Sequence, residues 1–390
     1  MTSRRGWLIV LGLAIGVIVS NSFARFAYGL ILPAMESDLG WNYTQLGWIN
    51  TANALGYVAG AILTLVLLGR VSASRLFSIG LLVTSVGLLM CGLGDGFWFL
   101  TFWRFVAGVS GAPVFIAGGA MAATLFPDNA EKNALAIAGY FGGSGVGMVV
   151  AGVALPSLFA SCGSSCWPEA WIGLGVASLL IAPISLWAAT QVQLPVQHQD
   201  KGSELPTTRM MFELVAYGLF AVGYIVYLTF IVAWANANGL PAIVVSQGWI
   251  LIGVGIVLSP FVWKPILASS SSGVPLALAC ALTGVATLIP MFLPSVIGFV
   301  GSGFLYGLVV FMGPGAITNF SRKNLPKELW AKSVGLFTLI FAVGQTVGPV
   351  AAGAIGDSTG SLGAGLISAA LILFAAATLA ACQRTIIKEQ

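Results

Sequence analysis

The sequence is short of charge. Only 7% of its 390 residues are charged while 58% are apolar, the mean hydropathy is +0.98, and a soluble domain carries about 25% charged residues. This composition excludes water as the main solvent. Apolar runs of about 20 residues, the length that a bilayer-spanning helix needs, follow one another with few gaps. Because the runs are continuous and do not alternate with period two, they predict membrane helices rather than a β-barrel.

Histidine and cysteine are scarce as well, which limits catalysis and metal binding. The only histidine, His198, lies in a polar segment, where a lone imidazole is normally solvated. The five cysteines are too few for a disulfide scaffold. Cys162 and Cys166 stand close together in a loop C-G-S-S-C, and they either form a disulfide or remain free thiols. Without a cluster of His, Cys or carboxylates in the apolar runs, we expect no metal, no cofactor and no enzyme.

The apolar runs predict twelve membrane helices and therefore an all-α membrane protein. Their predicted bounds are 7–33, 45–69, 75–94, 97–124, 133–160, 170–190, 211–235, 244–264, 274–293, 295–318, 331–356 and 362–382. We expect two pseudo-symmetric six-helix bundles, at 1–190 and 211–390. The segment 191–210 is polar and too short for a soluble domain, so we interpret it as a linker between the bundles.

Basic residues indicate the orientation, because Lys and Arg stay on the cytoplasmic side of a membrane. With the N-terminus inside, all 16 basic residues except Arg25 and Arg104 fall in cytoplasmic segments. The outer segments carry acidic residues instead: Glu36, Asp38, Asp95, Glu169 and Asp357. We expect both termini and the linker in the cytoplasm, with the chain spanning a bacterial-type inner (plasma) membrane. The net charge of +4 follows from this topology and gives no reason to expect nucleic acid as a partner.

The two halves of the sequence repeat each other. The matches keep their order along the chain, and they are Gly47-Trp48-Ile49 with Gly248-Trp249-Ile250, Gly147-x-x-x-Ala151-Gly152 with Gly348-x-x-x-Ala352-Gly353, Phe105 and Gly108 with Phe304 and Gly307, and Tyr28 with Tyr227. The offset is 201 residues for the first two matches and 199 for the others. Matches in this order indicate duplication and two parallel halves.

These features resemble the major facilitator superfamily over essentially the whole chain. Arg104 followed by Gly108 and Gly111 resembles the motif of its fourth helix, and the glycine-rich segments 143–147 and 344–349 resemble the motif of its helices 5 and 11. The segment from Arg25 to Pro33 is similar to the YbfB/YjiJ-type branch. The loop after helix 2 lacks the acidic residue usual in the superfamily, so we expect no charge latch of the usual kind there. The resemblance implies transport of a small molecule by alternating access.

Two arginines are predicted to lie deep in the membrane. Arg25 precedes Glu36 by 11 residues, and Arg104 follows Asp95 by 9. At 1.5 Å per helical residue both lie about 13 to 16 Å below the outer surface, near the middle of the core. A charge there costs at least about 2.5–3.5 kcal/mol and needs water or a partner. No acidic residue is predicted at this depth, since Glu213 lies only a few residues into its helix from the cytoplasmic side. We therefore hypothesise that an anionic substrate pairs with the guanidinium groups. Alternatively, the arginines bond helix carbonyls and hold the first half together.

Neutral polar side chains also recur in the middle of the predicted helices. Those that we regard as candidate substrate contacts are Asn21, Tyr28, Asn50, Asn53, Tyr57 and Tyr140 in the first half, and Tyr224, Tyr227, Tyr306 and Gln345 in the second. A tyrosine supplies an apolar wall and one hydrogen bond, which suits a small organic solute. For any one of these side chains, packing within the bundle is the more common role.

The sequence therefore predicts a monomeric secondary transporter. Its small-molecule substrate is expected to be an organic anion such as a carboxylate, bound in a central cavity, with a proton or a counter-anion as coupling partner. If both arginines are structural, efflux of a neutral or amphipathic metabolite or drug is favoured. A membrane receptor or scaffold that does not transport is the alternative from another class, but no loop is long enough for a signalling domain.

Overall fold

The computed structural model describes residues 3–68, 70–192 and 205–386. All regular secondary structure in these ranges is helical. Contacts divide the chain into two compact units, Met1–His198 and Gln199–Gln390. Most of the predicted linker 191–210, including His198, lies outside the described residues, so the linker remains a prediction.

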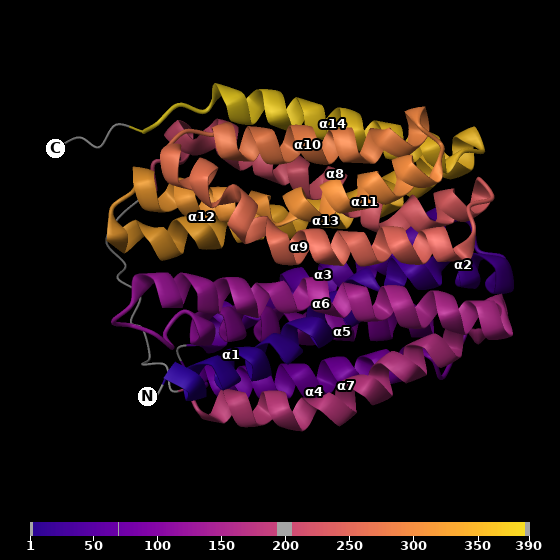
Figure 1. Cartoon of the computed structure of the whole chain (residues 1–390), viewed down its shortest axis with the longest axis horizontal. Coiled ribbons are helices and arrows are strands. Elements are labelled where there is room, and N and C mark those ends of the chain that lie inside the picture. The colour runs from indigo at the N-terminus through magenta and orange to yellow at the C-terminus, as the bar shows by residue number, and fades with distance from the viewer. Residues whose placement is uncertain (1–2, 69, 193–204, 387–390) are drawn as a thin grey trace. The chain divides into compact units, whose positions relative to one another are not determined.

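The N-terminal unit is a bundle of long helices that run side by side (Figure 1). Its first membrane span is built from three consecutive helical segments, which are α1 (Ser3–Val17), the π-helical η1 (Ile18–Phe26) and α2 (Tyr28–Leu39). The remaining elements are α3 (Tyr43–Leu67), α4 (Ala73–Cys91), α5 (Phe97–Ala122), α6 (Ala130–Cys162), the short 3-10 helix η2 (Ser164–Cys166) and α7 (Trp167–Thr190).

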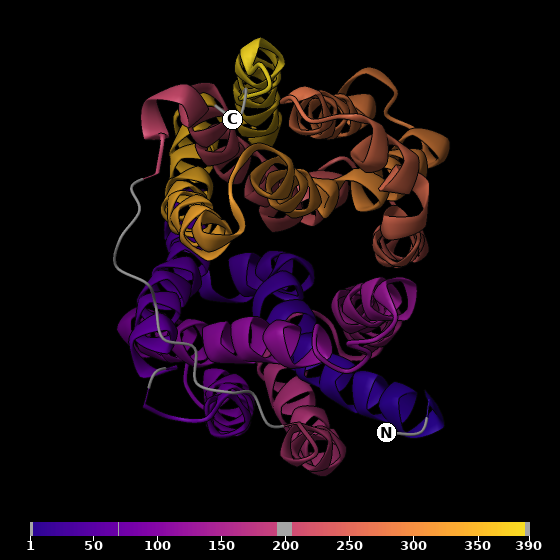
Figure 2. The same cartoon turned by 90° about the vertical axis from the view of Figure 1, so that its left-hand side faces the viewer.

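The C-terminal unit is a second bundle, and Figure 2 views its helices nearly end-on. Its elements are η3 (Thr207–Met210), α8 (Met211–Ala237), α9 (Ala242–Ser269), α10 (Val274–Phe292), α11 (Val296–Val310), α12 (Met312–Asn324), η4 (Lys327–Leu329), α13 (Trp330–Thr359) and α14 (Leu362–Cys382). The helices α11 and α12 together occupy the place of one predicted span, with a break at Phe311.

Twelve helical spans within the described residues are long and apolar enough to cross a membrane, which confirms the predicted all-α architecture. Three predicted helix ends fall five or six residues too early, which are those at 264 and 318, where the helices continue to Ser269 and Asn324, and the end of the first span. The first span was expected to end at Pro33, but it continues to Leu39 with Pro33 inside α2. A proline removes only its own backbone donor, and neighbouring groups in a membrane bundle can compensate for that loss. The helix ends instead at Gly40, whose φ of 65° forms a left-handed cap.

Glycines bring α3 and α5 into close contact. A Cβ atom on Gly56 would collide with the carbonyl oxygen of Phe105, and one on Gly108 would collide with the carbonyl oxygen of Asn53. Because these two glycines have no side chain, the backbones of α3 and α5 come into direct contact, as small residues allow in membrane helices. The glycine spacing around Gly108 is therefore a packing device between two neighbouring helices.

The same contact recurs in the C-terminal unit between α9 and α11. There a Cβ atom on Gly255 would collide with the carbonyl oxygen of Phe304, and one on Gly307 would collide with that of Ile252. Each of these positions lies 199 residues after its counterpart in the α3 and α5 pair, the offset already seen in the sequence. The duplication thus extends from sequence motifs to the contacts they make.

Candidate functional site

The first membrane span contains a π-helical segment at the depth where Arg25 was predicted. In this segment, η1, the backbone N–H of Ala27 donates to the carbonyl oxygen of Ser22 at 2.7 Å, five residues back. Every residue from Val19 to Phe26 is buried. Segments of π-helix are rare and are often found at functional sites. The backbone is therefore irregular over the stretch that carries Asn21 and Arg25.

Polar contacts with α6 fix the beginning of this segment. The Asn21 amide donates to the Ser144 hydroxyl at 3.2 Å, and the Ser22 hydroxyl donates to the Ser144 carbonyl oxygen at 2.6 Å. All three side chains are buried. Asn21, one of the predicted substrate contacts, therefore bonds to protein in this structure. Ser22 and Ser144 were not singled out from the sequence, because serines are common in membrane helices and carry no spacing signal of their own.

Arg104 supports η1 from α5. Its side chain is 0% exposed, and one guanidinium nitrogen donates to the carbonyl oxygen of Ala24 while another lies 3.4 Å from the Asn50 amide oxygen. The guanidinium carbon lies 5.0 Å from the ring centroid of Tyr28 and 5.1 Å from that of Trp171. These contacts match the alternative in which Arg104 bonds a helix carbonyl and holds the first half together.

Arg25 has a different environment. It lies at the C-terminal end of η1 and is 7% exposed. Its guanidinium carbon is 5.2 Å from the ring centroid of Tyr57 on α3 and 5.8 Å from that of Phe26. Guanidinium groups over aromatic faces gain a cation–π attraction that is larger when desolvated. The structure therefore brings Arg25 and Tyr57, both predicted substrate contacts, to one place in the N-terminal unit.

The middle of the N-terminal unit is positively charged. Both guanidinium groups lie well inside their membrane spans. The carboxylates of this unit instead stand in loops or near helix ends, at Glu36, Asp38, Asp95, Asp128, Glu131 and Glu169. Charges in a medium of low dielectric constant act over longer distances than in water. The unit thus presents a field that favours an anion at mid-membrane depth.

Three further predicted contacts in this unit bond to backbone carbonyls. The Asn53 amide donates to the Arg104 carbonyl oxygen at 3.1 Å. The Tyr28 hydroxyl donates to that of Leu46 at 2.7 Å, and the Tyr140 hydroxyl to that of Val114 at 2.7 Å. These bonds tie neighbouring helices together, as buried polar groups in membrane proteins must be satisfied internally. A substrate role for Tyr28, Asn53 and Tyr140 remains a prediction.

In the C-terminal unit, three of the four predicted side chains form one connected group. The Tyr224 hydroxyl donates to the Gln345 amide oxygen at 3.1 Å, and the Tyr306 hydroxyl donates to the Tyr224 carbonyl oxygen at 2.7 Å. Gln345 is 0% exposed, and its amide nitrogen has no hydrogen-bond partner among the described residues. An unsatisfied buried donor is costly, so this amide is a candidate contact for a polar group of a solute.

The fourth, Tyr227, stacks on Tyr306 with ring centroids 4.2 Å apart, and its hydroxyl lies 2.7 Å from that of Ser302. A larger aromatic stack stands next to this pair along α8. The stacked pairs within it have ring centroids 5.0 to 6.1 Å apart, and its members are Tyr217, Phe220, Tyr224 and Phe341. The three rings on α8 follow one another at three and four residues, a spacing that places them on one face of the helix and could have indicated the stack. Phe341 lies on α13, and no spacing in the sequence connects it with them.

The loop between α6 and α7 brings two cysteines of the N-terminal unit together. Cys162 and Cys166 are joined in the structure, with their Cα atoms 6.1 Å apart. Next to them Trp167 donates its indole N–H to the Asp38 carboxylate at 2.8 Å. The loop is therefore attached to the end of α2. The bridge itself stays a prediction for the protein in its membrane, and counting free thiols tests it.

Comparison with known families agrees with this arrangement of helices. A family model described as uncharacterised MFS-type transporter YbfB matches residues 17–381. The chain belongs to this family. Its members are transporters rather than enzymes, as the sequence led us to expect.

Two named transport proteins match part of the chain. Over 202 residues the chain is 26% identical to a putative metabolite transport protein of Haemophilus influenzae, which covers 52% of this chain and 47% of that protein. Over 163 residues it is 24% identical to the riboflavin transporter RibZ of Clostridioides difficile, covering 40% of this chain and 36% of that protein. The matches therefore span less than half the length of these relatives.

Solved transporters share the fold. The structure matches a bacterial homologue of the human lysosomal transporter Spinster, in an inward-facing and unoccupied conformation, with a TM-score of 0.74 and 16% identity over 100% of this chain and 99% of that one. It matches the nucleoside transporter NupG with a TM-score of 0.69 and 14% identity, over 97% and 100% of the two chains. At these identities the likeness establishes the fold, which is that of the major facilitator superfamily.

Proposed function

We propose that this chain is a secondary transporter that moves a small organic anion, a carboxylate, across the inner membrane by alternating access. The observation that carries the proposal is the position of Arg25, a buried guanidinium at the end of a π-helical segment in the middle of the first membrane span. The substrate is a small metabolite, in agreement with the relative that is described as a metabolite transport protein.

The two arginines have separate roles in this proposal. Arg104 donates to the carbonyl oxygen of Ala24 and is enclosed by Tyr28 and Trp171, so it supports η1. Arg25 lies beside the ring of Tyr57. Its guanidinium is a planar group with several N–H donors, and this geometry suits recognition of a carboxylate. Because an arginine fork can donate two parallel hydrogen bonds to a carboxylate, Arg25 supplies orientation as well as charge.

A neutral or amphipathic solute, moved outwards, is the second candidate. It is favoured by the aromatic stack of the C-terminal unit and by the Gln345 amide nitrogen, which suit a planar molecule with one acceptor. One relative is described as a riboflavin transporter. In this alternative both arginines serve the structure of the N-terminal unit.

Orientation, coupling and assembly belong to the same proposal. We place both termini in the cytoplasm, because the basic residues of the sequence fall on that side. A proton or a counter-anion couples to the solute, and the transporter acts as a monomer.

A ligand screen on the purified protein separates the two candidates. A ligand that binds only the folded state at 100 times its Kd raises the stability by about 2.7 kcal/mol, which a melting curve detects. We expect a set of small carboxylates to contain compounds that raise the melting temperature, and their uncharged amides to have no effect. A response confined to neutral or cationic planar compounds contradicts the carboxylate proposal and supports the second candidate.

A further inference from the structure

An aromatic row begins at Arg25 and crosses three helices of the N-terminal unit. The guanidinium carbon of Arg25 lies 5.2 Å from the ring centroid of Tyr57 on α3. Between ring centroids, Tyr57 lies 6.3 Å from Phe115 on α5, and Phe115 lies 4.9 Å from Phe141 on α6. Neither phenylalanine is among the candidate contacts chosen from the sequence, because a phenylalanine in a membrane helix is ordinarily a packing residue.

The members of the aromatic row retain accessible surface. Tyr57, Phe115 and Phe141 are each partly exposed. Arg25 keeps 7% of its surface exposed, whereas Arg104 keeps none. Both the cation and the rings of the row are therefore open to contact with a solute, unlike the fully enclosed Arg104.

Helical rise places the aromatic row on the cytoplasmic side of Arg25 in the proposed orientation. Tyr57 follows the first residue of α3 by 14 residues, and Phe115 follows that of α5 by 18. At 1.5 Å per residue these positions are about 21 and 27 Å from the outer ends of their helices, compared with about 16 Å from Glu36 to Arg25. A molecule whose anionic group meets Arg25 therefore finds the rings on its cytoplasmic side.

We propose that the solute is an aromatic carboxylate and that Phe115 and Phe141 select it over aliphatic ones. The inference rests on the proposed function, because it takes Arg25 as the partner of the carboxylate. The carboxylate accepts hydrogen bonds from the guanidinium group, and the ring of the solute packs against Tyr57 and Phe115. Aromatic walls with a few polar groups that fix the orientation are typical of sites for small ligands.

Aromatic rings attract one another through their geometry as well as through apolar area. The face of a ring is negative and its edge is positive, so ring pairs prefer offset or edge-to-face arrangements. The rings of the row already meet at large angles, with ring planes 70° apart for Tyr57 with Phe115 and 50° apart for Phe115 with Phe141. A saturated ring of similar size gains the apolar burial but not this attraction. The row therefore distinguishes an aromatic carboxylate from an aliphatic one.

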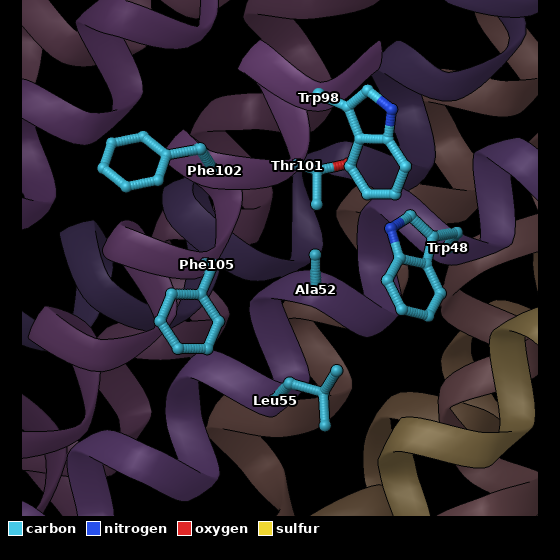
Figure 3. A pocket seen from close by; sticks show the side chains of 7 residues that line it. All are labelled: Trp48, Ala52, Leu55, Trp98, Thr101, Phe102 and Phe105. Carbon is cyan, nitrogen blue, oxygen red and sulfur yellow. The ribbon is translucent and has the colours of Figure 1, made fainter.

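A second group of rings on the same two helices provides a comparison. The groove between α3 and α5 in Figure 3 carries Trp98, Phe102 and Phe105, and none of the side chains that line it is charged. A carboxylate meets no cation there, so these rings lack the partner that Arg25 gives to the aromatic row. Phe102 is 56% exposed and lies on α5 like Phe115, which makes it a matched control.

The test compares carboxylates that differ in aromaticity. Benzoate is paired with cyclohexanecarboxylate, and phenylacetate with cyclohexylacetate, and their Kd values for the purified full-length protein are measured by isothermal titration calorimetry. One or two aromatic contacts correspond to a preference of about threefold to tenfold for the aromatic member of a pair.

The outcomes separate this inference from the proposed function. Equal Kd values within both pairs, or binding of neither pair while another carboxylate of the ligand screen binds, overturn the inference and leave the proposed function standing. If no carboxylate binds at all, both are overturned.

Leucine variants assign the preference to the aromatic row. Phe115→Leu and Phe141→Leu each replace a ring with an aliphatic side chain, and each is expected to bring the ratio of the two Kd values close to one with little change in the Kd of the saturated compound. Phe102→Leu should keep the wild-type ratio. Because both Kd values come from the same variant, a general loss of stability does not mimic this effect. An unchanged ratio in both Phe115→Leu and Phe141→Leu would contradict the proposal.

Discussion

Arg25 and Arg104 are chemically identical groups in different surroundings. Arg104 is completely buried, its guanidinium lies against the rings of Tyr28 and Trp171, and it donates to the backbone of η1. Arg25 lies at the edge of that segment and contacts Tyr57. The hydrogen bonds of Arg104 to Ala24 and Asn50 join α5 to the first span and to α3. Removing a buried charged group from such partners destabilises a fold strongly. Stability measurements should therefore separate the two residues.

We predict that Arg104→Lys destabilises the protein more than Arg25→Lys. Lysine keeps the charge but cannot donate to Ala24 and Asn50 from a planar fork, and loss of a charged hydrogen bond costs about 1.5–3 kcal/mol. Thermal unfolding followed by tryptophan fluorescence in detergent should show a larger decrease in melting temperature for Arg104→Lys than for Arg25→Lys. The opposite order would assign the structural role to Arg25.

Counting residues predicted the depth of both arginines but not their partners. Helical rise gave the expected depth of Arg104 below Asp95. This depth stays a prediction, and the structure shows that the Arg104 side chain is buried within its unit. Its contact with Ala24 depends on how α5 packs against the first span, which no local pattern encodes. Likewise, spacing placed Tyr28 and Asn53 in the middle of their helices, yet their bonds to the carbonyls of Leu46 and Arg104 appear only in the folded unit.

At the scale of elements, apolar length was the reliable signal. It predicted the twelve spans because the thickness of a bilayer fixes how long a helix must be. It did not predict η1, since a π-helical segment is stabilised by contacts such as those of Asn21 and Ser22 with Ser144 rather than by composition. It also ended the first span too early at Pro33, because the surrounding helices tolerate a proline there.

Close packing of α3 against α5 can be tested with one methyl group. In Gly108→Ala the new Cβ collides with the carbonyl oxygen of Asn53, so the helices must separate, at a cost of about 1–3 kcal/mol. Gly142→Ala is the control, because a Cβ there meets no atom of the described residues within 4 Å. We expect a lower melting temperature for Gly108→Ala and no decrease for Gly142→Ala. Equal melting temperatures would show that the contact tolerates a side chain.

The loop between α6 and α7 yields a prediction about thiols. If Cys162 and Cys166 are bridged in the membrane, the free thiols are Cys91, Cys280 and Cys382. Maleimide labelling of denatured, non-reduced protein should then modify three of the five cysteines. Cys162→Ser should leave transport intact, since the loop is also held by the bond between Trp167 and Asp38. Five modified thiols in the wild-type protein would rule out the bridge.

For the whole molecule, the orientation in the membrane is open to a direct test. We predict that the loop after α5 is cytoplasmic and the loop before it is external. In a chain whose native cysteines are replaced by serine, Asp95→Cys should react with an impermeant maleimide in intact cells, and Asp128→Cys should react only after permeabilisation. Both side chains are exposed in the structure, so access is limited only by the membrane. Labelling of Asp128→Cys from outside would reverse the proposed topology.

Duplication links the two halves, but their polar centres have diverged. The glycine contacts of α3 with α5 recur 199 residues later between α9 and α11, whereas Gly303 stands at the position that corresponds to Arg104. The N-terminal unit thus supplies buried charge, and the C-terminal unit supplies aromatic rings and the Gln345 amide. Retention of the packing with divergence of the polar groups is expected when the fold is shared and the substrate contacts are specialised.

The central claim is that Arg25 binds the anionic group of the solute, and counterflow in proteoliposomes tests it most directly. Vesicles that contain the protein are loaded with an unlabelled carboxylate found in the ligand screen, and entry of the labelled compound is measured. Arg75→Ala, which changes an exposed arginine at the start of α4, serves as the matched control.

We expect Arg25→Ala to abolish counterflow and Arg25→Lys to raise the KM, because lysine keeps the charge but loses the planar fork. Arg75→Ala should transport like the wild type, and all three variants should be recovered as folded protein. Normal counterflow by Arg25→Ala, or accumulation of only neutral or cationic compounds by the wild type, would contradict the account.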